Sequence, residues 1–338
     1  MIFRSGYLRV EALRGTSLPS LLAGHYDLGL FTASWDKRCL SVLGAAALAV
    51  DHSVVLCFKT HDEFGFQKNN EDTLCEHLAN IGSTVHRIDD ISEDVEQEWQ
   101  RLWLTITQLV TTSKPRRCVV DLSACPRYYS LGVISGLIKT SFSSEICVLY
   151  TEGEYDRTEY QREVADVPFS LGRWSNLPIP FLHGEINPSR PRHYVVSLGF
   201  EGIKTARVLS RDEPERITLV YPIPGVLPEY DDEVRLRNAD IIDRFKIPSD
   251  QLLSAAAGGA VSVWREITRA SQSWNPGEDV YFLCCGTKAH SLGMALYTLL
   301  SETPTVLYNV PDRHSFVGVK PSGYFAVFKI CDLSAPFQ

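Results

Sequence analysis

The sequence lacks a hydrophobic run long enough to cross a bilayer, which needs roughly 20 apolar residues. Its longest largely apolar run, Leu40 to Val50, ends at Asp51. Residues 1–10 contain Arg4 and Arg9 but no apolar core followed by a small-residue cleavage site, so no signal peptide is expected. We therefore predict a cytoplasmic protein with no membrane partner.

A surplus of positive charge is also lacking. The chain has 33 Lys and Arg residues against 41 Asp and Glu residues, for a formal net charge of -8. Long nucleic acid is bound without sequence preference by an extended surplus of Lys and Arg that neutralises its phosphates. The composition excludes that class of partner, but a small anionic ligand in a local basic pocket is compatible with it.

Metal and cofactor motifs are absent as well. There is no Cys-x-x-Cys pair, no His-x-x-x-His and no His-Glu-x-x-His, so no metal site is predicted. The odd count of 9 cysteines, most of them in apolar runs, indicates reduced core thiols. Without Gly-x-Gly-x-x-Gly, a P-loop or Gly-x-Ser-x-Gly, neither a dinucleotide cofactor nor a serine hydrolase is expected.

The features that are present predict an α/β protein. The chain of 338 residues is 44% hydrophobic and long enough for two domains. Short apolar runs typical of buried parallel strands alternate with helical patterns, which favours a parallel sheet with helices on both faces. The predicted strands are 28–31, 54–58, 118–122, 146–150, 194–198, 217–221, 280–284 and 305–308; the predicted helices are 38–49, 70–81, 95–111, 129–141, 239–245, 260–271 and 291–300.

The order of elements occurs twice, which predicts two tandem Rossmann-like halves. Three pairs of segments match at nearly constant separation: 54–56 with 217–219, 130–132 with 291–293, and 149–150 with 307–308. Duplication explains these matches, and so does the shared topology of any two such domains. The proline-rich segment 166–192 is predicted to be a linker or wrapping loop between domains 1–165 and 193–338.

Two strand-to-helix turns are the first candidates for ligand binding, because ligands of open α/β sheets gather at the carboxyl ends of strands and at helix N-termini. After the strand at 118–122, Asp121, Ser123 and Arg127 could contact a ligand. The same residues would also fit a helix cap, formed by Asp121 or Ser123, and a surface salt bridge of Arg127. After the strand at 280–284, Gly286 permits close backbone approach and Lys288 suits a phosphate; a capped helix with an exposed lysine fits equally. The predicted ligand contacts are Asp121, Ser123 and Arg127 in the first turn and Gly286, Thr287, Lys288, His290 and Ser291 in the second.

A nucleophilic site is a further hypothesis for the second turn. Cys284 or Cys285, at the strand end beside a helix N-terminus, would have a reactive thiol, and His290 would serve as its base. The amides of Gly286 and Thr287 would form an oxyanion hole. Cys285 and His290 are therefore the catalytic candidates if the protein is an enzyme.

A second pair of turns, 32–38 and 199–204, places an aromatic residue beside an acid and then a cation at a helix entrance. The aromatic would stack on a base and the carboxylate would hold a ribose hydroxyl. A hydrophobic staple with an acidic helix start would give the same pattern. The predicted contacts are Asp36, Arg38 and Glu201.

The Asp121-Leu122-Ser123 turn with Arg127 resembles the Asp-hydrophobic-Thr/Ser turn of CARF domains, and Gly286-Thr287-Lys288 resembles their Gly-Thr-Lys helix start. CARF domains are Rossmann-like sensors of cyclic oligonucleotides, and SAVED domains are similar to two fused CARF units. The resemblance implies a pocket shared by the two halves, a partner protein and a role in antiviral defence.

These observations lead to three hypotheses. The first is a sensor that binds a small anionic, nucleotide-like ligand and signals to a partner protein. The second is a hydrolase or transferase acting on a nucleotide-like substrate at the same turns. The third is an assembly subunit without a ligand.

Overall fold

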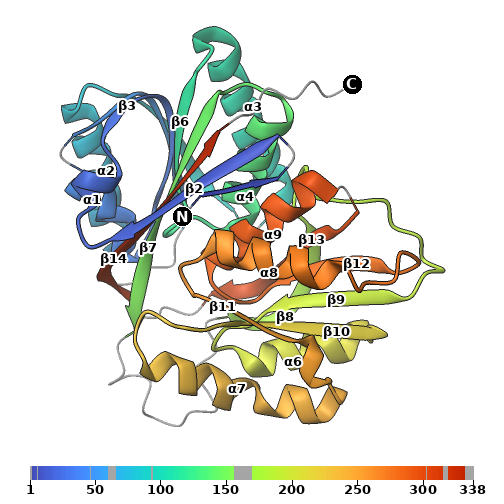
Figure 1. Cartoon of the computed structure of the whole chain (residues 1–338). Helices are drawn as coiled ribbons and strands as arrows, with labels where there is room; N and C mark the ends of the chain where they lie inside the picture. The colour runs from blue at the N-terminus through green and yellow to red at the C-terminus, as the bar shows by residue number, and fades with distance from the viewer. Residues whose placement is uncertain are drawn as a thin grey trace. The chain divides into compact units, whose positions relative to one another are not determined.

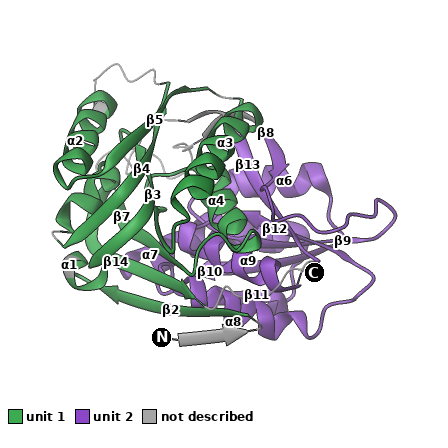
Figure 2. Ribbon diagram, turned by 90° about the horizontal axis from the view of Figure 1, so that it is seen from above, with its two compact units in different colours: residues 1–157, 316–338 green, residues 158–315 purple. Residues whose placement is uncertain are grey.

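The computed structural model describes residues 2–5, 7–45, 47–59, 66–92, 94–155, 170–301, 303–314 and 319–331. The chain divides into two compact units, which Figure 2 shows in green and purple. Unit 1 comprises residues 1–157 and 316–338, and unit 2 comprises residues 158–315.

Unit 1 is built on an eight-stranded sheet with the order β1-β2-β14-β7-β6-β3-β4-β5. The strands from β7 to β5 in this order run parallel, and β14, β2 and β1 join in antiparallel pairs. β6 and β7 are nearly continuous buried runs, as expected for strands covered on both faces. The strand bounds are β1 Ile2–Ser5, β2 Leu8–Gly15, β3 Gly24–Ala33, β4 Leu48–Phe58, β5 Thr84–Ile91, β6 Arg117–Asp121, β7 Glu145–Tyr155 and β14 Val319–Cys331.

Helices cover both faces of this sheet, with α1 and α2 on one side and α3 and α4 on the other (Figures 1 and 2). Leu74 and Leu78 of α2 pack into the same core as Val55 of β4. On α3, the Asp94 carboxylate caps the first turn by accepting from the Gln97 amide at 3.0 Å. The helix bounds are α1 Leu18–Leu21, the 3₁₀ helix η1 Lys37–Gly44, α2 Phe66–Asn80, α3 Val95–Ser113 and α4 Arg127–Lys139.

Unit 2 is built on a six-stranded sheet with the order β11-β10-β9-β12-β13-β8, in which only β8 is antiparallel to its neighbour. Helices α6 and α7 lie on one face and α8 and α9 on the other (Figure 1). The bounds are β8 Ser170–Pro178, β9 Arg192–Ser197, α6 Gly202–Asp212, β10 Arg216–Pro222, α7 Glu229–Phe245, η2 Ser249–Gln251, β11 Leu252–Ala255, α8 Ala260–Ser271, β12 Asp279–Cys284, α9 Lys288–Ser301 and β13 Thr305–His314.

The two sheets share one topology. The order β5-β4-β3-β6-β7-β14 in unit 1 corresponds strand by strand, with the same directions, to β11-β10-β9-β12-β13-β8 in unit 2. This confirms the predicted α/β fold with two Rossmann-like halves.

The three matched segment pairs lie on corresponding elements: β4 and β10, α4 and α9, and β7 and β13. The correspondence extends to a helix contact. A Cβ on Gly132 of α4 would lie 2.7 Å from the Trp99 ring of α3, and a Cβ on Gly293 of α9 would lie 2.9 Å from the Val263 Cβ of α8. The same glycine therefore permits the same helix pair to pack closely in each unit, as a duplication predicts.

The observed division differs from the predicted domains 1–165 and 193–338. β14 pairs with β7 and β2 and so belongs to unit 1, and β8, inside the predicted linker 166–192, pairs with β13. Residues 166–169 of that linker lie outside the described part. Each of these strands pairs in an antiparallel direction, and each lies in the sequence outside the run of alternating strands and helices that forms the rest of its unit. Such long-range pairing leaves no mark in local periodicity, which explains the error.

Local predictions failed at two further places. The predicted helix 38–49 is instead a 3₁₀ helix that ends at Gly44. The last residues of the predicted helix belong to β4, which begins at Leu48, because residues 48–50 pair with the start of β3. The predicted helix 239–245 is only the end of α7. The first part of this helix, from Glu229, buries few apolar residues, Tyr230 and Val234, so its apolar stripe is weak.

Candidate functional site

The four predicted turns lie where each sheet reverses its strand order. In unit 1 the chain runs outward from β3 toward β5 and from β6 toward β7, so the reversal lies between β3 and β6; in unit 2 it lies between β9 and β12. Crevices outside the carboxyl ends of strands at such points are the usual ligand sites of open α/β sheets. Within each unit, the structure therefore places both predicted turns at one edge of the sheet.

In unit 2 the two turns are in backbone contact. A Cβ on Gly199 would lie 2.6 Å from the Cys285 carbonyl oxygen, and a Cβ on Gly286 would overlap with Ser197 Oγ and the Leu198 carbonyl. A side chain at either position would clash, so only glycine permits the two turns to pack this closely.

Thr287 organises the start of α9. Its hydroxyl donates to the Ala257 carbonyl at 2.7 Å and accepts from the His290 amide at 3.2 Å, so it caps the helix. Ser291 is fully buried, and its hydroxyl donates to the Thr287 carbonyl at 3.2 Å. Lys288, the first residue of α9, is half-buried at the positive end of the helix dipole. Of these predicted contacts, Lys288 is the one that brings a charge to the edge of the sheet.

His290 is a buried structural histidine. Its Nε2 lies 3.1 Å from the carbonyl oxygens of Ala255 and Ala256, and its Nδ1 lies 3.4 Å from Ser197 Oγ. Burial lowers the pKa of His290 to about 4, so the ring is neutral at pH 7. It connects the ends of β9 and β11 to α9.

This arrangement does not form the predicted dyad with Cys285. Both nitrogens of His290 are engaged with other atoms, and the Cys285 amide donates to the Leu283 carbonyl at 3.2 Å, inside its own turn. The hydrogen bonds of His290 therefore go to the ends of β9 and β11 and not to Cys285.

Around the β9 turn, Glu201 precedes α6 and its carboxylate lies 3.4 Å from Lys204 Nζ. The Arg237 guanidinium of α7 lies 5.9 Å from the centre of the Phe200 ring. Arg237 also pairs with Glu233 at 2.8 Å. Lys204 and Arg237 thus add two cations, each with a carboxylate partner, to the same edge as Lys288.

Asn238, which was not a predicted site residue, holds this turn in place. Its Nδ2 donates to the Gly199 carbonyl at 2.8 Å and to the Val234 carbonyl at 2.7 Å. The roles of Asn238 and Arg237 depend on α7 packing beside the β9 turn, and no local signal in the sequence indicates it.

In unit 1, the predicted contacts Asp36 and Arg38 bind each other. Arg38 Nη2 lies 2.6 Å from Asp36 Oδ2, the two side chains are 10% and 12% exposed, and Arg38 Nη1 donates to the Thr151 carbonyl at 3.5 Å. Burial alone would lower the pKa of Arg38, but the Asp36 carboxylate outweighs it, and the pKa lies above its ordinary value. The pair neutralises itself within the fold.

Asp121 and Ser123 also form bonds within the fold. Asp121 Oδ1 accepts from the Ser123 amide at 2.8 Å, and Ser123 Oγ accepts from the Thr151 amide at 2.9 Å. Both residues are buried, whereas Arg127, the first residue of α4, is half-buried. Arg127 therefore occupies in α4 the position that Lys288 occupies in α9.

Two groups of metal-ligating side chains occur among the described residues, and neither lies at these turns: Cys57, Glu71 and Asp89, and His25, Asp27 and Asp51. The Arg87 guanidinium pairs with both Glu71 and Asp89 of the first group, so a cation already occupies it.

Fold and site together define an α/β protein with two Rossmann-like sheets, in which two glycine-containing turns pack together at the strand ends of unit 2. No protein-family profile and no curated protein matches the sequence. Among solved structures, UDP-GlcNAc 2-epimerase from Neisseria meningitidis bound to UDP-GlcNAc is similar at 9% identity, with 77% of each chain covered and a TM-score of 0.23. The functionally unknown protein PA1789 from Pseudomonas aeruginosa PAO1 is similar at 10% identity, with 88% of this chain and 95% of that chain covered and a TM-score of 0.24.

Neither likeness is strong enough to support an argument about function, and neither structure is described as a CARF or SAVED protein. Within the described part of the chain, none of the helices combines the length and apolar character needed to cross a membrane.

Proposed function

We propose that this protein is a binding module for a small anionic, nucleotide-like ligand, and that unit 2 holds the anionic group at the turns after β9 and β12. The observation that carries the proposal is the close approach of these two turns at the point where the strand order reverses, permitted by Gly199 and Gly286. The ends of strands and the N-termini of helices at such a point are the usual binding place for a phosphate in open α/β sheets.

The electrostatics of the turns favour an anion. Helices α6 and α9 begin directly after the turns that follow β9 and β12. Each helix N-terminus carries about half a positive charge from its helix dipole. Lys288 adds a full charge at the first position of α9, and its ammonium is suited to a phosphate. Arg127 gives the first turn of α4 in unit 1 the same character, so we assign it the same role.

Asp121, Ser123, Thr287 and Ser291 shape the turns through the hydrogen bonds given above rather than through direct contact with the ligand. Asp36 and Glu201 each have a basic partner, Arg38 and Lys204. Ligand binding through Arg38 or Glu201 would therefore require that pair to open.

Binding without chemistry is the favoured version of this proposal, because His290 is neutral and fully engaged and cannot take a proton from Cys285 without breaking its bonds to the strand ends. A sensor also needs a component that responds to it. A partner protein is therefore part of the proposal, and a role in defence rests on the CARF resemblance alone.

Thermal unfolding of the full chain against AMP, ADP, cyclic dinucleotides, cyclic trinucleotides and pyrophosphate tests the proposal. A ligand at 100 times its Kd stabilises the folded state by about 2.7 kcal/mol, which raises Tm measurably. Lys288→Ala should abolish the rise caused by the active compound. Arg269→Ala, which removes an exposed charge from the last turn of α8, is the control and should preserve it.

If no compound raises Tm, or if Lys288→Ala responds like the control, anion binding at the α9 turn is refuted. A compound that binds and is converted to product by wild-type protein but not by Cys285→Ala would favour the enzyme hypothesis instead.

A further inference from the structure

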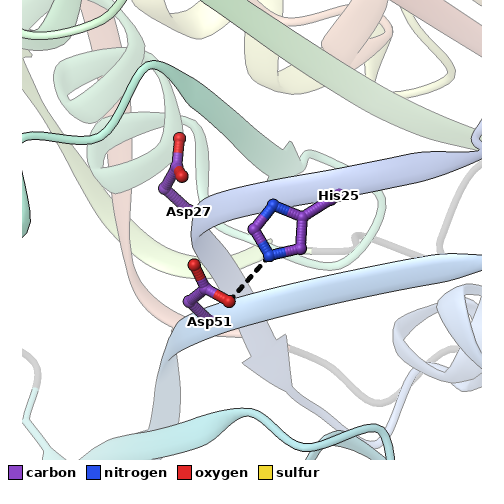
Figure 3. A group of neighbouring side chains, drawn as sticks. All are labelled: His25, Asp27 and Asp51. Carbon is purple, nitrogen blue, oxygen red and sulfur yellow. Dashed lines mark hydrogen bonds and ion pairs between the residues drawn. The ribbon is translucent and has the colours of Figure 1, made fainter.

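Three side chains with metal-binding atoms gather at the beginning of two neighbouring strands of unit 1. His25 and Asp27 stand two residues apart on β3 and therefore share one face of the sheet, and Asp51 lies on the adjacent parallel strand β4 (Figure 3). One ligand atom from each residue lies within 4.8 Å of the others. Strands hold such a set more firmly than a loop would.

Asp27 is oriented by the backbone. Its Oδ2 accepts from the amides of Arg116 and Arg117, each at 2.8 Å, so the position of the whole carboxylate is fixed while Oδ1 remains as an acceptor. Hydrogen bonds of this kind to a carboxylate are the usual outer support of a metal ligand. His25 Nε2 lies 2.8 Å from Asp51 Oδ1, so these two ligand atoms already converge.

The charge around the group is unbalanced. Within the described residues, neither Asp27 nor Asp51 has a lysine or arginine side chain within ion-pair distance, and the Asp51 carboxylate pairs with His25. The Arg117 guanidinium pairs with Glu145 at 2.7 Å and donates to the His25 carbonyl at 2.8 Å. This distinguishes the group from the one around Arg87, in which a protein cation sits among the acids.

From this geometry we propose that His25, Asp27 and Asp51 bind a divalent transition-metal ion of the Zn²⁺ or Co²⁺ type. One imidazole nitrogen and two carboxylate oxygens suit such ions better than Mg²⁺ or Ca²⁺, which prefer oxygen ligands alone. His25 and Asp51 are exposed, so an ion can enter from solvent and water completes its coordination.

The ion would join β3 to β4 at their amino ends, whereas the predicted ligand turns of unit 1 lie at the carboxyl ends of the strands. The metal proposal is therefore independent of the proposed anion binding. The bound ion is expected to stabilise unit 1.

The test is titration of the metal-stripped full chain with Zn²⁺ by calorimetry and with Co²⁺ by visible absorption. We expect one saturable site, whose affinity falls about tenfold or more in His25→Gln and in Asp51→Asn because each loses one of three ligands. Asp240→Asn, which removes an exposed carboxylate from α7, is the control and should bind as wild type does. Asp27 is left intact because it also holds two backbone amides.

Two outcomes overturn the proposal. One is the absence of saturable binding by the wild-type chain. The other is binding that both variants retain in full, whether through cysteine thiolates, which give Co²⁺ an intense near-ultraviolet charge-transfer band, or elsewhere. Far-ultraviolet circular dichroism of the two variants establishes that any loss of affinity is not a loss of folding.

Discussion

Replacing His290 with glutamine should reduce the dependence of the free energy of unfolding on pH below pH 6.5. The imidazole of the unfolded chain takes up a proton near pH 6.5, its ordinary pKa, but in the folded protein burial lowers that pKa to about 4. Between these two values the unfolded state binds more protons, so the free energy of unfolding falls as the pH falls. The stability that depends on a neutral, buried His290 is fully present above pH 6.5 and is lost as the pH falls to 4.

The magnitude follows from the pKa difference. Each unit of pH within the window costs about 1.4 kcal/mol, so the full window costs about 3 kcal/mol. Glutamine does not titrate, and its amide nitrogen can still donate to the Ala255 carbonyl that His290 contacts. The variant should be less stable than wild type at pH 7, and that gap should narrow by about 2 kcal/mol on going from pH 6.5 to pH 5.

Urea unfolding at several values between pH 7 and pH 4.5 measures the gap directly. His193, whose pKa burial lowers to about 3, titrates in both proteins and cancels from the difference. His183→Gln, a change at an exposed histidine, should leave the slope unchanged. Parallel curves for wild type and His290→Gln would refute the assignment of His290 as a buried neutral histidine.

Two further substitutions test the packing of the turns. Gly286→Ala should cost about 3 kcal/mol because its Cβ would overlap with backbone of the β9 turn, whereas Gly15→Ala, whose Cβ would meet only Leu21 at 3.7 Å, should stay within about 1 kcal/mol of wild type; equal denaturation midpoints would contradict the close approach. Arg38→Met should cost about 3 to 5 kcal/mol by leaving the largely buried Asp36 without its cation, and adding Asp36→Asn should recover part of the loss. Purely additive losses in that double variant would contradict a coupled pair.

The sequence carried enough information to predict the βα alternation and the position of the turns. Parallel strands buried on both faces, such as the runs around Val119 and Val195, appear as short continuous apolar segments that local pattern alone identifies. The turns follow because a buried strand must end in polar or glycine residues before its helix begins, as at Gly286. Within each unit, strand order then brings turns of the first and fourth βα strands to one edge.

The sequence could not show what each polar side chain of those turns binds. Asp36 and Arg38 looked like free ligand contacts but neutralise each other, and His290 looked like a base but is a buried support. Whether a charged group is available depends on the neighbour that packs against it, and Arg237 reaches the β9 turn only because α7 lies beside it.

Only the tertiary structure decided the boundaries of the units and the gathering of His25, Asp27 and Asp51. The edge strand β8 and the interior strand β14 are held by hydrogen bonds to strands far away in the chain, and the acids of β3 and β4 meet through the register of two parallel strands. Local periodicity records which face of an element is buried, but it does not record which distant element provides the covering partner. That choice is made by the free energy of the whole sheet, in which every backbone donor and acceptor of a buried strand must find a partner.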